Sequence, residues 1–225
     1  MGKAQSRAVI DHLVFGCEQL ETGTAYLERV IGKDFVVGGK HDLMTTHNKL
    51  LRLQGSVYLE SIAIDFKAAK AKGDIGRKRW FSLDDTRTRQ KLAIAPYPLT
   101  WVVAVDNVDE AMARCGYNPG HITKMTRENF EWSLTVPDDG GLNEQGLLPS
   151  FIKWPSGLNP ANQLPENGTT LHKIVLVHPQ PNFISAAIDR IGIEDFIEVR
   201  SGSVELIFEL KTSAGKLVSF SNAII

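Results

Sequence analysis

The chain has 225 residues, of which 43% are hydrophobic and 23% are charged, values typical of a globular protein with one sizeable core. Its 25 basic and 26 acidic residues give a net charge of −1, so there is no basic excess to neutralise nucleic-acid phosphates. No run of about 18 apolar residues occurs. We therefore expect neither a nucleic-acid partner nor a membrane partner.

The cysteines and the N-terminus indicate a cytoplasmic protein. Cys17 and Cys115 lie far apart in apolar surroundings and outside any CxxC motif, so both are predicted to be reduced core thiols. The N-terminal residues contain no long apolar segment, and we expect no signal peptide or membrane anchor.

Residues 1–66 predict a strand, a helix and three further strands. Residues 8–16 are apolar on both faces, which is typical of a strand buried between two layers. Residues 18–31 carry one apolar stripe and are followed by Gly32, a residue that suits a helix end. Three strands are then predicted, at residues 35–38, 48–53 and 56–65.

Residues 67–97 interrupt this pattern. The stretch 68–79 is basic and broken by glycine, which predicts a surface excursion, and residues 80–83 form an apolar island expected to fold back over another part of the chain. Arg77, Lys78 and Arg79 either bind an anionic substrate or remain solvated. A short polar helix is predicted after the island.

Two further units follow the same order. Residues 98–156 predict a strand, a helix that begins at Asn107, and three strands. Residues 157–168 are rich in Pro, Asn and Gly and predict a linker, and residues 169–225 predict a third strand-helix-strands unit. Repeated βαβββ units in one compact α+β domain are therefore expected. The alternatives are a doubly wound parallel sheet and a ferredoxin-like fold, and the first is disfavoured because each helix is followed by several strands.

Three motifs carry a family resemblance: Ile10-Asp11-His12-Leu13-Val14, Thr46-His47-Asn48-Lys49-Leu50-Leu51 and Tyr58-Leu59-Glu60. Together they resemble the glyoxalase-like domain group of the vicinal oxygen chelate superfamily, which includes glyoxalase I and the extradiol dioxygenases. The resemblance implies a curved mixed sheet that forms a cup, with helices on its outer face. It also implies a divalent metal held by inward residues on the first and last strands of two units.

Carried over to this chain, the first unit offers His12 and Glu60 as metal ligands or acid/base groups. His47 would complete a set suited to Zn, Mn, Ni or Fe(II). The second unit brings Trp101 and Trp154, with Lys153, where its ligands are expected. Asn48, Tyr58, Trp101 and Trp154 are the predicted substrate-binding residues.

The residues leave three interpretations open. Strand alternation places His12 on one face with Ile10 and Val14, and it surrounds Glu60 with apolar neighbours, where a charge needs a partner. That partner is a metal in a His12, His47 and Glu60 site, His12 itself in a metal-free pocket, or a structural cation, Arg52 or Lys49.

Two functions follow from these interpretations. One is a glyoxalase-like lyase, isomerase or dioxygenase-type enzyme that acts on a small carbonyl- or hydroxyl-bearing metabolite. The other is a non-catalytic protein that binds a small molecule in the same cup. Formation of a homodimer is compatible with either function.

Overall fold

The computed structural model describes residues 8–73, 76–127, 130–155, 158–193 and 195–223. The elements of the first two units are β1 (Ala8–Gly16), α1 (Leu20–Ile31), β2 (Val36–His41), β3 (Thr46–Arg52), β4 (Tyr58–Ile64), α2 (Phe66–Lys72), α3 (Thr86–Leu92), β5 (Tyr97–Val105), α4 (Val108–Arg114), β6 (His121–Arg127), β7 (Phe130–Val136), η1 (Asn143–Gly146) and β8 (Ser150–Lys153). The rest are η2 (Pro160–Gln163), β9 (Thr170–His178), α5 (Pro181–Ile191), β10 (Ile197–Ser201), β11 (Glu205–Lys211) and β12 (Leu217–Ser221).

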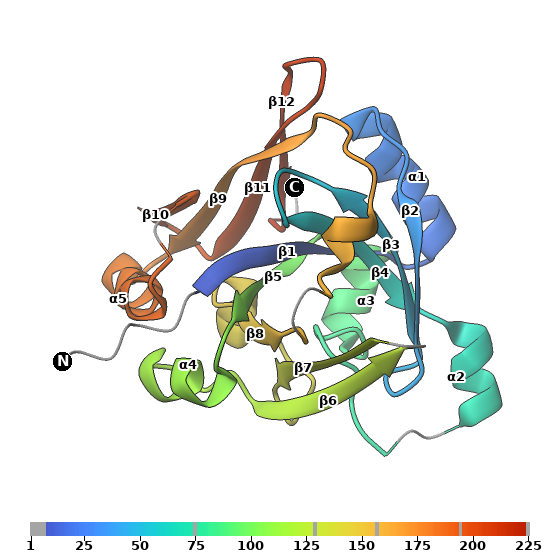
Figure 1. The fold of residues 1–225 in the computed structure, drawn as a ribbon, viewed down its shortest axis with the longest axis horizontal. Coiled ribbons are helices and arrows are strands. Elements are labelled where there is room, and N and C mark those ends of the chain that lie inside the picture. Colours follow the sequence, from blue (N-terminus) through green and yellow to red (C-terminus); the bar gives the residue numbers. More distant parts are fainter. Residues whose placement is uncertain (1–7, 74–75, 128–129, 156–157, 194, 224–225) are drawn as a thin grey trace.

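One mixed sheet of eight strands forms the body of the protein, in the order β2-β3-β4-β1-β5-β8-β7-β6. The two halves repeat each other, because β4 is parallel to β1 and β8 is parallel to β5, while β1 and β5 pair antiparallel at the centre. The sheet curls until its edge strands β2 and β6 come into contact (Figure 1). The predicted α+β fold, with repeated units that form a curved cup, is confirmed.

Residues at the ends of the main helices explain where these elements begin and stop. Gly32 ends α1 with a φ of 77°, and Gly192 ends α5 with a φ of 81°, a left-handed conformation that glycine adopts without steric cost. The Asn107 side chain accepts a hydrogen bond from the Glu110 backbone N–H at 3.3 Å and so begins α4. The helix end predicted at Gly32 and the helix start predicted at Asn107 are therefore observed.

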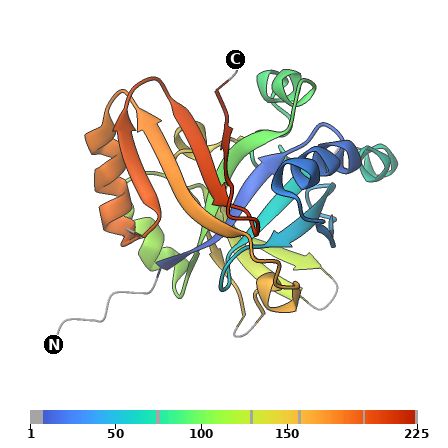
Figure 2. The ribbon, with the colours of Figure 1, turned by 90° about the horizontal axis from the view of Figure 1, so that it is seen from above.

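The third unit has the expected order of elements but a different strand arrangement. Its sheet runs β10-β9-β11-β12, so the strand parallel to β9 is the next one in sequence rather than the last. This sheet packs on the outer face of the large sheet, beside α1 and α4 (Figure 2). Phe208 and Phe220 meet the ring of Phe15 edge-on, with centroids 5.5 and 5.1 Å apart. Burial of each such ring stabilises the fold by about 1.5–3 kcal/mol.

The apolar island at residues 80–83 packs against the inner face of the large sheet. Trp80, Phe81 and Leu83 are buried in an apolar cluster with side chains of β5, β7 and β8, so this segment does fold back, into the cup. The Arg79 guanidinium donates to the Asp84 carboxylate at 2.6 Å and to the Thr45 hydroxyl at 2.7 Å. Arg79 therefore anchors the segment, and its charge is already paired.

Two expectations concern membranes and the N-terminus. Over the described residues, every helix is too short or too polar to cross a bilayer. The absence of a signal peptide was expected from a segment that includes residues 1–7, which lie outside the described part of the chain.

Both thiols are predicted to be unreactive in the folded protein. Burial raises the pKa of Cys17 to about 12 and also raises the pKa of Cys115. The thiolate is the reactive form, so neither cysteine should react rapidly with a disulfide reagent at about pH 8. Both of the 2 cysteines should react once the protein is unfolded in urea. Rapid labelling of native protein would contradict this burial.

Candidate functional site

A bulge in β1 sets the position of the first two site residues. Ile10 pairs with Val103 and His12 pairs with Val102, so Asp11 is an extra residue between them. A bulge re-aims the side chains beside it. Ile10 consequently packs in the core on the outer face, whereas His12 lines the cup. The expectation that His12 shares a face with Ile10 is wrong for this reason, while Val14 does lie on the inner face.

Asp11 holds the His12 ring in place. Its Oδ1 lies 2.6 Å from His12 Nδ1, and its Oδ2 accepts hydrogen bonds from Trp154 Nε1 and Asn159 Nδ2, both at 2.9 Å. A carboxylate only accepts hydrogen bonds, so this contact places a proton on Nδ1 and directs Nε2 into the cup. Tyr58 stacks on the other side of the imidazole, with ring centroids 4.7 Å apart.

Glu60 is fixed from the neighbouring strand β3. Its Oε1 accepts a hydrogen bond of 2.5 Å from Asn48 Nδ2. A second bulge, in β2, leaves Gly38 beside this amide, where an added Cβ would lie 2.1 Å from Asn48 Oδ1. Gly38 therefore leaves the space that the Asn48 side chain occupies. The structural alternative for Glu60 is not observed, because Lys49 pairs with Glu21, and Arg52 pairs with Glu166.

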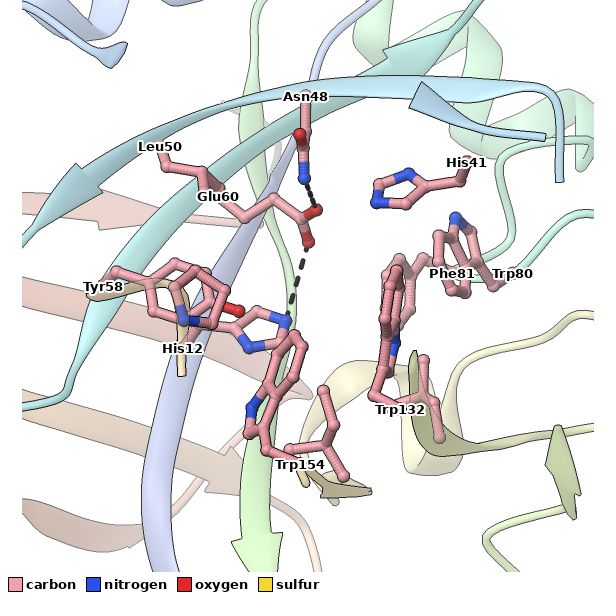
Figure 3. Close-up of a pocket in the computed structure, with 13 residues that line it drawn as sticks. His12, His41, Asn48, Leu50, Tyr58, Glu60, Trp80, Phe81, Trp132 and Trp154 are labelled. Carbon is pink, nitrogen blue, oxygen red and sulfur yellow. Dashed lines mark hydrogen bonds and ion pairs between the residues drawn. The ribbon is translucent and has the colours of Figure 1, made fainter. Parts of the chain in front are cut away.

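The carboxylate of Glu60 and the imidazole of His12 face each other. Glu60 Oε2 lies 3.6 Å from His12 Nε2, and both residues are 5% exposed. Figure 3 shows the two groups pointing into one space that aromatic rings surround. The space between them has a volume of about 30 Å³, which is room for about two water molecules.

Aromatic side chains form most of the remaining wall. Trp132 and Trp154 pack together with centroids 5.3 Å apart, and Trp80 stacks on Phe81 at 5.2 Å (Figure 3). His41 meets Trp80 edge-on at 4.9 Å. Of the predicted substrate-binding residues, Asn48, Tyr58 and Trp154 therefore lie at the cup.

Several residues of the site were not among the predicted site residues: Asp11, His41, Trp80, Phe81, Trp132 and Asn159. Asp11 lies beside His12 in the first motif, and a carboxylate next to an imidazole in sequence is a signal that could have identified Asp11 as a site residue. Asn159 comes from the segment predicted as a linker, and no local pattern connects it with Asp11.

His47 is not brought to this site. On β3 the side chains alternate, so Asn48 lines the cup while His47 and Lys49 point to the opposite face, where Lys49 pairs with Glu21 of α1. The three-ligand set of His12, His47 and Glu60 is therefore not assembled.

Trp101 also lies on the wrong face for substrate binding. It is fully buried in the outer core, and its indole N–H donates to the Leu147 carbonyl at 2.9 Å. The same alternation explains this placement, because the neighbouring Val102 faces the inner cluster.

The strand register shows what the second half of the sheet contributes. His12 pairs with Tyr58 and Val14 with Glu60, while Val102 pairs with Ser150 and Ala104 with Ile152. The repeat therefore places Val102 where the first half has His12, and Ile152 where it has Glu60. Lys153 and Trp154 follow this position rather than occupy it.

These residues do not fit the metal that the resemblance implies. His12 Nε2 and Glu60 Oε2 are two donors, whereas catalytic zinc sites use three protein ligands. Val102 and Ile152 offer none. Among the described residues there is also no cluster of three His, Cys, Asp or Glu side chains suited to a metal ion.

His47 provides a pH-dependent test of its placement. Burial lowers its pKa from the usual 6.5, and the Asp65 carboxylate opposes this shift only in part. The unfolded state then binds the proton more readily, so stability is lost as the pH falls below about 6.5. We expect His47→Gln to lose less stability than the wild type between about pH 6.5 and pH 5, as measured by urea unfolding. An equal loss in both proteins would contradict the neutral, half-buried imidazole.

Comparisons with known proteins agree with this architecture. The glyoxalase-like domain family model matches residues 10–192, and no curated protein matches the chain. A hypothetical protein from Staphylococcus aureus shares the fold, with 13% identity, a TM-score of 0.58, and coverage of 88% of this chain and 87% of its own.

Two enzymes are less similar in structure. A Mn(II)-bound glyoxalase from Novosphingobium aromaticivorans has 12% identity and a TM-score of 0.46 over 96% of this chain and 82% of that one. A methylmalonyl-CoA epimerase from Streptomyces coelicolor has 12% identity and a TM-score of 0.40 over 65% of this chain and 94% of that one. Because the family model covers most of the sequence, the chain belongs to the glyoxalase-like domain family.

Proposed function

We propose that the protein is an enzyme that moves protons on a small carbonyl- or hydroxyl-bearing metabolite, with Glu60 and His12 as its acid/base pair. The observation that carries this proposal is the buried approach of Glu60 Oε2 to His12 Nε2 at 3.6 Å. A carboxylate and an imidazole in this arrangement reach one substrate from two directions. The cytoplasm, where both cysteines would stay reduced, is the proposed location.

The two groups would act on adjacent atoms of the substrate. Glu60 takes the proton from the carbon next to a carbonyl, and protonated His12 donates its Nε2 proton to the carbonyl oxygen, which gives a neutral enol. Glu60 then returns its proton to the same carbon while His12 takes back the proton of the enol oxygen. Where the first carbon carries a hydroxyl, Glu60 can instead protonate the former carbonyl carbon while His12 takes the proton of that hydroxyl, which moves the carbonyl to its neighbour. Asp11 supports this role because its carboxylate holds the His12 ring by Nδ1 and leaves Nε2 facing the cup.

The surroundings of the pair favour such chemistry. Asn48 Nδ2 fixes the Glu60 carboxylate at 2.5 Å, so little reorientation precedes proton transfer. His12 and Glu60 are buried beside Trp132 and Trp154, and low exposure to water strengthens electrostatic interactions inside the cup.

The alternative is non-catalytic binding of a small molecule in the same cup. One observation favours it: the second half of the sheet contributes Val102 and Ile152, which carry no reactive group. A binder needs the walls of the cup but not the His12–Glu60 pair. The two functions therefore differ in how they respond to substitution of that pair.

Deuterium exchange tests the enzyme proposal without a known substrate. A pool of small carbonyl and hydroxycarbonyl metabolites is incubated with the protein in heavy water, and incorporation at carbon is followed by NMR. We expect exchange with the wild type and a loss of about 100-fold or more in His12→Ala and in Glu60→Gln, because acid/base groups contribute roughly 10²–10⁴-fold.

Asp11→Asn should weaken exchange less and change its pH profile, because Asp11 acts through His12. Val37→Ala, on an exposed side chain of β2, is the control that should leave exchange unchanged. If every compound that binds the wild type is inert to exchange, the non-catalytic alternative holds instead.

A second prediction concerns metal. Because His12 and Glu60 supply only two donors, purified protein should contain less than about one tenth equivalent of transition metal. Added Zn, Mn, Ni or Fe(II) should then leave the melting temperature unchanged, since a ligand that binds the folded state raises it. Stoichiometric metal, lost in His12→Ala, would contradict the two-donor description.

A further inference from the structure

The cup contains more negative than positive charge. Asp11 and Glu60 are 1% and 5% exposed, and His12 lies between them, 2.6 and 3.6 Å from their oxygens. Among the described residues that line the cup, none is a lysine or an arginine. The group of Asp11, His12 and Glu60 therefore keeps a net negative charge even when His12 is protonated.

The uncompensated charge is that of Glu60. The Asp11 carboxylate receives three donors, from His12, Trp154 and Asn159. Within the described part of the chain, Glu60 receives one, from Asn48, and its second oxygen has only the longer contact with His12. A buried carboxylate with so little compensation is costly, and a cation placed next to it removes much of that cost.

The walls opposite Glu60 suit an organic cation. In Figure 3 the rings of Trp132, Trp154 and Phe81 border the space into which the carboxylate points. The faces of aromatic rings attract weakly hydrated cations such as alkylated ammonium groups. A hydrated metal ion, in contrast, would meet two protein donors and apolar walls.

We propose that the substrate of this cup carries a small organic cation, an alkylated ammonium head that lies between Glu60 and the aromatic rings. This inference rests on the proposed function for the position of the site, and it adds the class of substrate. Phosphates, carboxylates and other anions would bring a further negative charge next to Asp11 and Glu60, so the cup discriminates against them.

Entry of such a head requires one local change. A quaternary ammonium group is larger than the present 30 Å³, so Trp80 and Phe81 must shift outward when it binds. Trp80 Nε1 is buried without a hydrogen-bond partner among the described residues, so this movement breaks no hydrogen bond of the indole. Phe81 and Ser82 have φ angles of 57° and 56°, a strained conformation for residues with side chains.

A pair of isosteres tests the proposal by titration calorimetry. Choline and 3,3-dimethylbutan-1-ol have the same shape, but choline carries the positive charge. We expect choline to bind the wild type about tenfold tighter than the neutral alcohol. Glu60→Gln should reduce this preference to near parity, because it removes the charge and keeps the shape of the side chain.

Two tryptophan variants separate the cage from general effects on folding. Trp132→Leu should weaken choline binding severalfold, whereas Trp101→Phe, on the opposite face of the sheet, should leave it unchanged. Circular dichroism and melting temperature verify that each variant is folded. Tetramethylammonium should compete with choline, while acetate and inorganic phosphate should not.

Four results would overturn the inference: equal or tighter binding of the neutral alcohol, no binding of either compound, competition by the anions, or displacement of choline by stoichiometric Zn or Mn. Neither isostere has a carbon–hydrogen bond next to a carbonyl, so calorimetry reports binding alone. Deuterium exchange without choline binding overturns only this inference. Choline binding without exchange on any compound overturns only the enzyme proposal.

Discussion

The β-bulge at Asp11 is the constraint on which the candidate site depends. Without the extra residue, strict alternation along β1 would send the Asp11 and His12 side chains to opposite faces. With it, the carboxylate reaches the imidazole at 2.6 Å and holds the ring against Tyr58. The same carboxylate accepts hydrogen bonds from Trp154 and Asn159, which lie more than half the chain length away in sequence. Closing this network therefore also fixes where the chain passes after β8.

The outer face of the large sheet forms the main core, and the inner face forms the pocket. The outer face packs against α1, α4 and the sheet of the third unit, and its core includes Phe15 and Trp101. The inner face carries the polar side chains of His12, Glu60 and Asn48. Beside them lies an apolar cluster that includes Trp80 and its neighbours from residues 80–83. A rigid outer core thus supports a pocket whose wall includes one segment in a strained conformation. Local rearrangement of that segment would leave the main core unchanged.

The two halves of the sheet repeat in backbone but not in chemistry. Equivalent positions hold His12 and Glu60 in one half and Val102 and Ile152 in the other. This asymmetry removes the donors that a shared metal would need. It also places apolar side chains opposite the only carboxylate-imidazole pair among the described residues that line the cup. The charge of Asp11 and Glu60 is then the dominant electrostatic feature that a ligand meets.

The sequence alone determined the order of the elements, because helix ends at Gly32 and Gly192 and apolar strands are local signals. It also indicated His12, Asn48 and Glu60 as site residues, because each of the three motifs contains one of them. Only the tertiary structure decided which face each side chain takes. One extra residue in β1 places Ile10 on the outer face while His12 faces the cup. Regular alternation along β3 and β5 places the side chains of His47 and Trp101 on the outer face, away from the cup. Contacts such as Asn159 with Asp11 join residues far apart in the chain, so no local pattern encodes them; they form only when the sheet curls.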